Sequence, residues 1–110
     1  MTDAPRDNMG LGESFSPTDL VATAIGTCML TVMGIAAQKA SLELKGTKVK
    51  VVKEMAAAPV RRIQTLRVDI HFPGHFTADQ RKALETAAHN CPVSKSLHPD
   101  VQVPVTFHWE

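Results

Sequence analysis

The stretch SPTDLVATAIGTC, residues 16–28, leads into 18 consecutive residues without a charged side chain, Leu20 to Ala37. Pro17 follows Ser16, and proline is favoured at the first position of a helix, where its missing N–H has no helical partner to lose. A helix from about Pro17 to Ala40 would be roughly 36 Å long at 1.5 Å per residue. It would be apolar nearly all round, which is typical of a buried core helix. The stretch therefore predicts one long helix that other elements must cover.

The same uncharged run reaches the lower length limit of a membrane span. Asp19 and Lys39 flank it without an aromatic belt, and small or polar residues dilute its hydrophobicity, namely Thr23, Gly26, Thr27, Thr31 and Gly34. These features favour a core helix and a protein without a membrane partner. One small sheet covers only one side of such a helix, and the remaining elements are too few to cover the other. We therefore expect an obligate homodimer, with the two long helices buried between the subunits.

Three later segments have the patterns of strands. Valines among lysines at 48–53 indicate a strand with one wet face, which closes near Ala58-Pro59. Apolar and polar residues alternate at 66–72 and again at 101–109, the period of a half-buried strand. The last segment contains Pro104, which has no N–H to donate to a neighbouring strand. We therefore predict that the last strand lies at an edge of the sheet.

Two shorter helices complete the predicted order. Thr77 and Gln80 have the spacing of a capping box, which starts a helix through about Asn90, and a short helix follows at 92–97. The main elements are then helix, strand, strand, helix, strand, an α+β fold with an antiparallel sheet packed on the long helix rather than a βαβ repeat. The chain is predicted to be a single domain, 1–110, in which residues 1–15 form an arm or loop.

Composition limits the function classes. A chain of 110 residues has room for one small core. Its 12 basic and 11 acidic residues give a net charge of +1, without the basic patch that nucleic-acid binding requires, so we expect no nucleic-acid partner. Residues 1–8 are polar and do not resemble a secretion signal. We expect a cytoplasmic protein whose cysteines are thiols at rest.

The two cysteines lie in different predicted settings. Cys28 lies in the middle of the long helix, whereas Cys91 precedes Pro92 at or next to a helix N-cap, where amide dipoles favour a thiolate. A free cysteine is usually a small buried hydrophobe, and composition alone favours that role for Cys28. For Cys91 a reactive role is nearly as well supported. The cysteines are 63 residues apart in the sequence, so spacing leaves open whether they form one site.

The histidines do not form a metal-binding pattern. The five of them show neither a His-x-x-x-His pair nor a Cys-x-x-Cys partner, so we expect no metal site. His71 and His108 fall on the wet faces of strands. His89 is close to Cys91 in sequence and could act as a local base. Lys95 lies on the helical face of Cys91, and we interpret it as a solvated charge rather than a thiolate stabiliser.

Residues 16–28 and the later Asn90-Cys91-Pro92-Val93-Ser94-Lys95-Ser96-Leu97 resemble the OsmC/Ohr superfamily of osmotically induced and organic-hydroperoxide-resistance proteins. The chain is more similar to the OsmC-like subgroup than to Ohr proper. The resemblance implies an intertwined α+β homodimer and a thiol-dependent peroxidase that needs no cofactor. Cys28 would be the peroxidatic cysteine that reduces an organic hydroperoxide and becomes a sulfenic acid. Cys91 would be the resolving cysteine that forms a disulfide with it, which an external dithiol reduces.

The chain departs from the pattern of these peroxidases. In them the residue after the helix-starting proline is a Glu that orients an Arg toward the peroxidatic sulfur, and here that residue is Thr18. Asp19 is shorter and points about 100° away on a helix. Arg6 is the one candidate before the helix, and we interpret it as a solvated arm residue. The family's usual strands before the helix are also expected to be missing. The alternative function is therefore a non-catalytic dimer that binds a small apolar ligand at the subunit interface.

Overall fold

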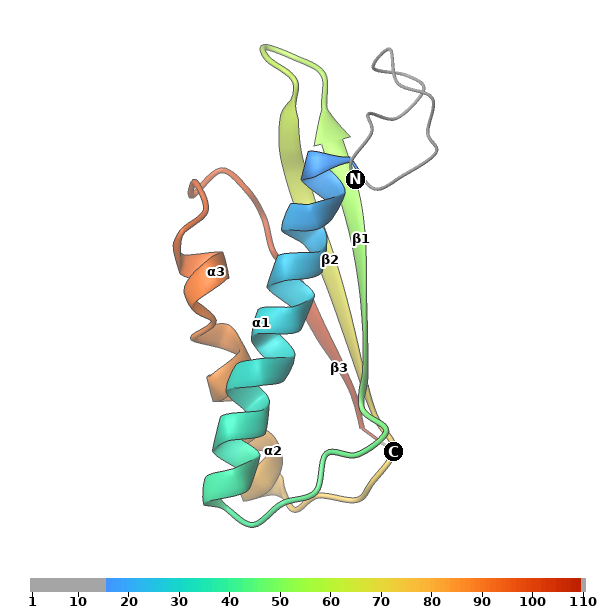
Figure 1. The fold of residues 1–110 in the computed structure, drawn as a ribbon, viewed down its shortest axis with the longest axis vertical. Coiled ribbons are helices and arrows are strands. Elements are labelled where there is room, and N and C mark those ends of the chain that lie inside the picture. The colour runs from blue at the N-terminus through green and yellow to red at the C-terminus, as the bar shows by residue number, and fades with distance from the viewer. Residues whose placement is uncertain (1–15, 110) are drawn as a thin grey trace.

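The computed structural model describes residues 16–109, so Arg6 and the whole of the expected N-terminal arm lie outside the described residues. One long helix crosses a three-stranded sheet, and two shorter helices lie beside it (Figure 1). In chain order the elements are α1 (Pro17–Lys39), β1 (Lys48–Ala56), β2 (Arg62–Phe72), α2 (Ala78–His89), α3 (Pro92–Lys95) and β3 (Val105–Trp109). Every predicted element is present, and the α+β class is confirmed.

The sheet has the order β1-β2-β3 and is mixed. β1 and β2 pair antiparallel, with an irregularity in register between Glu54 and Met55, whereas β2 and β3 pair parallel. The prediction of an antiparallel sheet was therefore wrong for β3. The chain leaves one end of β2 and returns through α2 and α3 to the other end, so that β3 runs in the same direction as β2. The predicted edge position of β3 is confirmed, although the strand begins after Pro104 rather than at Val101.

The ends of α1 are set by local hydrogen bonds. The Ser16 side chain accepts from the Asp19 N–H at 3.2 Å, and the Asp19 carboxylate accepts from the Ser16 N–H at 3.0 Å. This reciprocal pair is a capping box, followed by Pro17 in the first turn. Further along, Gly26 lets the helix approach β1 closely, because an added Cβ would lie 3.0 Å from a methyl group of Val51. The helix therefore lies closely packed on β1.

All three helices lie on one face of the sheet, and the core lies between the two layers (Figure 1). The inward residues of β2 alternate with outward ones, and Leu66, Val68 and Ile70 are fully buried. The side chains that cover them come from α1 and α2, namely Ile25, Met29, Met33, Leu84 and Ala88. The opposite face of the sheet is exposed. The result is an elongated slab of 47 × 28 × 20 Å.

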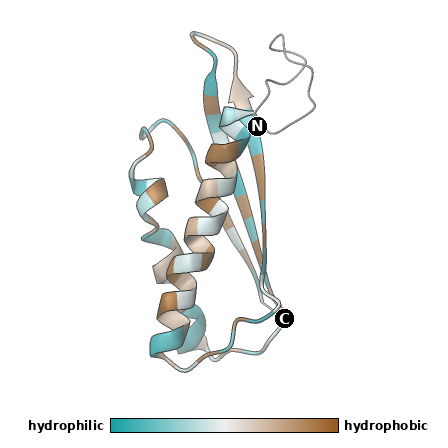
Figure 2. Cartoon of the chain, viewed as in Figure 1, coloured by the Kyte–Doolittle hydropathy of each residue, from teal (hydrophilic) through white to brown (hydrophobic). Residues whose placement is uncertain are grey.

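The second long side of α1 is not covered by the described residues, 16–109. Leu20, Leu30 and Ile35 are 46%, 36% and 51% exposed. Figure 2 shows white and brown along most of α1, and the teal of polar residues at its C-terminal end. By length and hydropathy alone this helix could span a membrane, and a third of its most apolar window is buried in the fold. The predicted burial of α1 is thus present on one side only.

Candidate active site

The fold brings Cys28 and Cys91 together. Cys28 lies in the middle of α1, and Cys91 is the N-cap of α3, the neighbouring short helix. Cys91 is completely buried, Cys28 is half-buried, and both are free thiols. The Cys91 side chain directly affects the ionisation of the Cys28 thiol, so the two thiols are neighbours in one apolar cluster. The sequence had left this juxtaposition open, and the structure supplies it.

The surroundings of Cys28 favour its protonated form. Burial raises the pKa of the Cys28 thiol above its ordinary value, because a thiolate loses hydration in an apolar setting. The neighbouring Cys91 sulfur, toward which the protonated Cys28 thiol can donate, raises this pKa further, as does negative charge on that sulfur. The Val93 backbone N–H acts in the opposite direction by donating toward the Cys28 sulfur. The resting site is therefore a dithiol, in which one backbone N–H is ready to support a thiolate.

Short hydrogen bonds hold the turn that presents Cys91. The Cys91 N–H donates to the carbonyl of Ala88 at 3.2 Å, at the end of α2. Its own carbonyl accepts from the Ser94 hydroxyl at 2.9 Å and from the Lys95 N–H at 3.2 Å. The Asn90–Lys95 segment is thereby fixed at both sides of the cysteine. The position of the Cys91 thiol against α1 follows from this turn rather than from a flexible loop.

A second polar cluster surrounds the N-terminus of α1. Lys53 Nζ donates to Asp19 Oδ1 at 2.7 Å, to Thr18 Oγ1 at 2.9 Å and to Ser16 Oγ at 3.4 Å. The hydrogen bond from Lys53, the largest cause, holds the pKa of Asp19 below its ordinary value of 3.8, and the Ser16 N–H adds to the effect. Asp19 therefore serves the cap and this ion pair.

Sequence reasoning missed Lys53, although a signal was present. In β1 the lysines at 48 and 50 are exposed, whereas Lys53 lies among the half-buried positions. A lysine on the inner side of an alternating strand needs a partner, because a buried charge without one is costly. A pocket of about 470 Å³ beside Thr18 also contains Arg62, Ile63 and His98. Lys53 and Arg62 are thus two cations that the fold places beside Thr18.

Other predicted residues lie outside this pair of thiols. Lys95 is exposed, as predicted for a solvated charge. His89 is exposed and packs edge-on against Phe107, with ring centroids 5.7 Å apart. His71 and His108 are exposed on the outer face of the sheet, as the alternation predicted. Among residues 16–109, no group of three or more His, Cys, Asp or Glu side chains could hold a metal ion.

The model of the OsmC-like protein family matches residues 10–106, nearly the whole chain. The chain belongs to this family. A search of curated proteins gave no match. Among solved structures, an osmotic stress induced and detoxification response protein from Psychrobacter arcticus is 45% identical, with a TM-score of 0.90, and the alignment covers 97% of this chain and 77% of that one.

Two more distant solved structures share the fold of this OsmC-like protein. An organic hydroperoxide resistance protein from Legionella pneumophila is 18% identical, with a TM-score of 0.81 and coverage of 96% of this chain and 78% of that one. One from Elizabethkingia anophelis is 16% identical, with a TM-score of 0.80 and coverage of 97% and 78%. At these identities the likeness shows the fold. The family match over residues 10–106 confirms the resemblance that the residues around the two cysteines indicated.

Proposed function

We propose that the protein is a thiol-dependent peroxidase that reduces organic hydroperoxides. The observation that supports this most directly is the contact between the Cys28 and Cys91 thiols, brought together from segments 63 residues apart. A pair of neighbouring thiols can deliver two electrons and store the oxidised state as a disulfide. A half-buried sulfur next to a fully buried one fits a sequence in which the accessible cysteine reacts first.

The chemistry balances with these two side chains and one hydroperoxide. The Cys28 thiolate attacks the terminal oxygen of the hydroperoxide, the O–O bond breaks, and the substrate leaves as an alcohol after it takes up a proton. Cys28 is then a sulfenic acid. The Cys91 thiolate attacks the Cys28 sulfur, water leaves, and a disulfide forms. An external dithiol exchanges with this disulfide and restores both thiols, which is the chemistry of a reducing, cytoplasmic compartment.

The raised pKa of Cys28 makes deprotonation the demanding step. The Val93 N–H supports the thiolate, but burial and Cys91 act against it. At the N-terminus of α1, Thr18 and Asp19 are both engaged by Lys53. These observations favour a second candidate function, a dimer that binds a small apolar molecule and whose thiols are inert. The two functions differ in whether Cys28 is consumed by a stoichiometric oxidant.

The test is the intact mass of the reduced protein after brief exposure to one equivalent of tert-butyl hydroperoxide, with hydrogen peroxide in parallel. The peroxidase predicts a loss of two hydrogens, located to a Cys28–Cys91 disulfide and faster with the organic oxidant. Cys28→Ser should abolish the reaction, and Cys91→Ser should allow Cys28 to pass to higher oxidation states. An unchanged mass would reject the peroxidase and leave the ligand-binding dimer. A Cys91→Ser variant with unaltered oxidation products would reject the resolving role.

We also propose that the protein acts as a homodimer through the exposed side of α1. Leu20, Leu30 and Ile35 are large apolar side chains that are exposed there. A groove of about 530 Å³ between α1 and β1 continues this surface, and its lining includes Leu30, Val49, Val51 and Val52. A second copy that packs on this surface would bury the same side chains in both subunits by two-fold symmetry. It would also form an apolar setting around the half-buried Cys28, which supports selectivity for organic over hydrogen peroxide.

Light scattering at micromolar concentration tests the dimer. We expect twice the mass of the chain for the wild-type protein and for Val60→Asp, an exposed apolar position in the β1–β2 connection. Ile35→Asp places a charge in the proposed interface and should yield monomer. A monomeric wild-type protein would disprove the proposal, and so would an Ile35→Asp variant that stays dimeric.

A further inference from the structure

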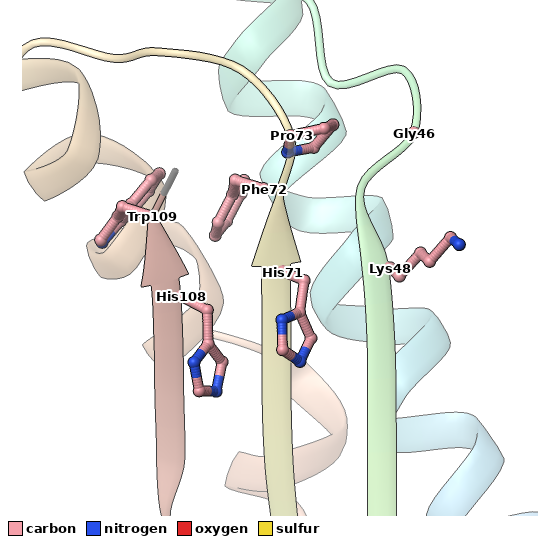
Figure 3. A pocket seen from close by; sticks show the side chains of 7 residues that line it. All are labelled: Gly46, Lys48, His71, Phe72, Pro73, His108 and Trp109. Carbon is pink, nitrogen blue, oxygen red and sulfur yellow. The ribbon is translucent and has the colours of Figure 1, made fainter.

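Two imidazoles are stacked on the outer face of the sheet, on the side away from the thiols. His71 of β2 and His108 of β3 are directly opposite each other in the parallel register. Their ring centroids are 4.2 Å apart, and the ring planes differ by 6°. Figure 3 shows the two rings side by side in front of the strands. The stacking holds both rings side by side at one place on this face.

The charges around this pair are mainly basic. His108 Nε2 lies 2.9 Å from Asp69 Oδ1. Lys48 is the register partner of His71 on β1, and Lys50 is the partner of Asp69. Chiefly the hydrogen bond with His108, and then the positive charge of the basic groups around it, hold the pKa of Asp69 below its ordinary value. Asp69 is thus already partnered within a group of basic side chains.

The stacked pair forms one side of a pocket of about 430 Å³, at the end of the sheet where β2 and β3 finish and β1 begins. Lys48 belongs to the same polar side, and Figure 3 shows its ammonium directed away from the rings on a flexible stem. The other side is formed by Pro73 and by the ends of β2 and β3 at Phe72 and Trp109, whose rings stack on each other on the helix side of the sheet. Gly46 belongs to the rim, and its φ of 88° and the nearby Pro73 leave no room for a larger side chain.

We propose that this pocket binds a small organic anion, a carboxylate or phosphate ester that carries an apolar group. The anionic group would accept hydrogen bonds from the His71 imidazole and from Lys48, whose long stem can turn toward it. The apolar group would lie against the Pro73 ring. Because the Asp69 carboxylate already bonds His108, it does not compete with the anionic ligand for His71 and Lys48. A metal ion fits less well, since it would have to break that bond and would find no third ligand among the described residues.

The charges that face His71 favour an anion. They come from Lys48 and Lys50 of β1, Asp69 on its own strand and His108 of β3. The one carboxylate among them is already bonded to His108. An anion at this place would therefore meet no unpaired negative charge among these groups.

NMR of the histidine rings of the reduced full chain provides the test. Benzoate, phenyl phosphate and inorganic phosphate are titrated separately at one pH. We expect saturable shifts of the His71 and His108 signals, with tighter binding of both aromatic anions than of inorganic phosphate. His71→Gln and Lys48→Gln should each weaken benzoate binding by about tenfold, the usual value of a charge-assisted hydrogen bond. His98→Gln, a 72% exposed position elsewhere, is the matched control and should bind like the wild type.

Three results would overturn the proposal. The first is the absence of saturation for both aromatic anions at about 10 mM, because a specific site should be saturated at that concentration. The second is unchanged affinity in His71→Gln, provided that its spectrum shows the wild-type fold. The third is tighter binding of inorganic phosphate than of both aromatic anions. None of these outcomes depends on the reactivity of Cys28, so the proposed pocket and the peroxidase function can each be rejected without rejecting the other.

Discussion

Each side of the sheet has a pair of like titratable groups, two thiols on the inner side and two imidazoles on the outer side. The two settings shift the pKa of a nearby acidic group in opposite directions. On the inner side, Cys28 and Cys91 meet among apolar residues, and burial together with the second sulfur raises the pKa of Cys28. On the outer side, His71 and His108 stack in water beside Asp69, whose pKa is lowered by its bond with His108. Burial without an opposite charge suppresses ionisation, and exposure beside an opposite charge supports it.

The largest expected effect contrasts neighbouring residues on the two faces. Ile70 is fully buried and His71 is exposed. Ile70→Ala should lower the free energy of unfolding by about 2–5 kcal/mol, because it removes core contacts and leaves a cavity. His71→Ala should change it by no more than about 0.5 kcal/mol. Urea denaturation of both variants measures this difference, and a costly His71→Ala would mean that the stacked pair supports the fold.

A smaller effect is expected at the thiols. Cys91→Ala removes the side chain that raises the pKa of Cys28, so more Cys28 thiolate should be present at pH 8. The rate of alkylation of Cys28 by iodoacetamide at that pH should rise several-fold over the wild type. Mass spectrometry of the alkylated peptide measures it, with Ser94→Ala, which keeps both thiols, as the control. An unchanged or slower rate would show that Cys91 does not suppress the ionisation of Cys28.

Lys53→Met tests the ion pair at the start of α1. We expect a loss of about 1 kcal/mol or less at pH 7, because the Asp19 carboxylate remains 37% exposed and is screened by water. The pKa of Asp19 is lowered in the folded state, so its stabilisation is present above the ordinary value of 3.8 and is lost as the pH falls through the folded-state value. Thermal unfolding at several pH values should show the two proteins converging in acid. A difference that persists there would exclude the ion pair as its source.

The smallest effect is expected for Asp69→Asn. The lowered pKa of Asp69 means that its stabilisation is present above about pH 4 and disappears at lower pH. The variant should therefore lose slightly less thermal stability than the wild type between about pH 5 and pH 2. Since Asp69 lies on the wet face, we expect a smaller change than for Lys53→Met. An equal or larger change would indicate that the outer charges matter more to the fold than their exposure suggests.

Sequence patterns predicted the elements well because each depended on local signals. The uncharged run fixed α1 to within one residue, and Thr77 and Gln80 form the predicted capping box at α2. The direction of β3 is not local, because it depends on how the chain returns through α2 and α3. An alternating strand has the same pattern in parallel and antiparallel pairs. No residue in this segment therefore indicated that β3 would pair parallel rather than antiparallel.

Only part of the candidate site was predicted, because only part of it depends on local signals. Each cysteine was placed correctly in its own helix, but their contact depends on how α3 packs on α1, which spacing alone does not reveal. The family resemblance supplied the pairing that the residues could not. Lys53 was missed because it was grouped with the lysines at 48 and 50 on the wet face of the predicted strand. A lysine on the same face of the strand as the inward valines indicates a partner for its charge on the inner side of the sheet.

Trp109 gives the molecule an optical reporter of its last strand. It is the one tryptophan of the chain. Its ring stacks on Phe72 at a centroid distance of 4.0 Å, and the guanidinium of Arg81 lies 5.3 Å from its centroid. If β3 detached from β2, the indole would leave this setting for water, and its emission would shift to longer wavelength. Fluorescence would then follow the detachment of the C-terminal edge, while circular dichroism, dominated by α1, would follow the remainder of the fold.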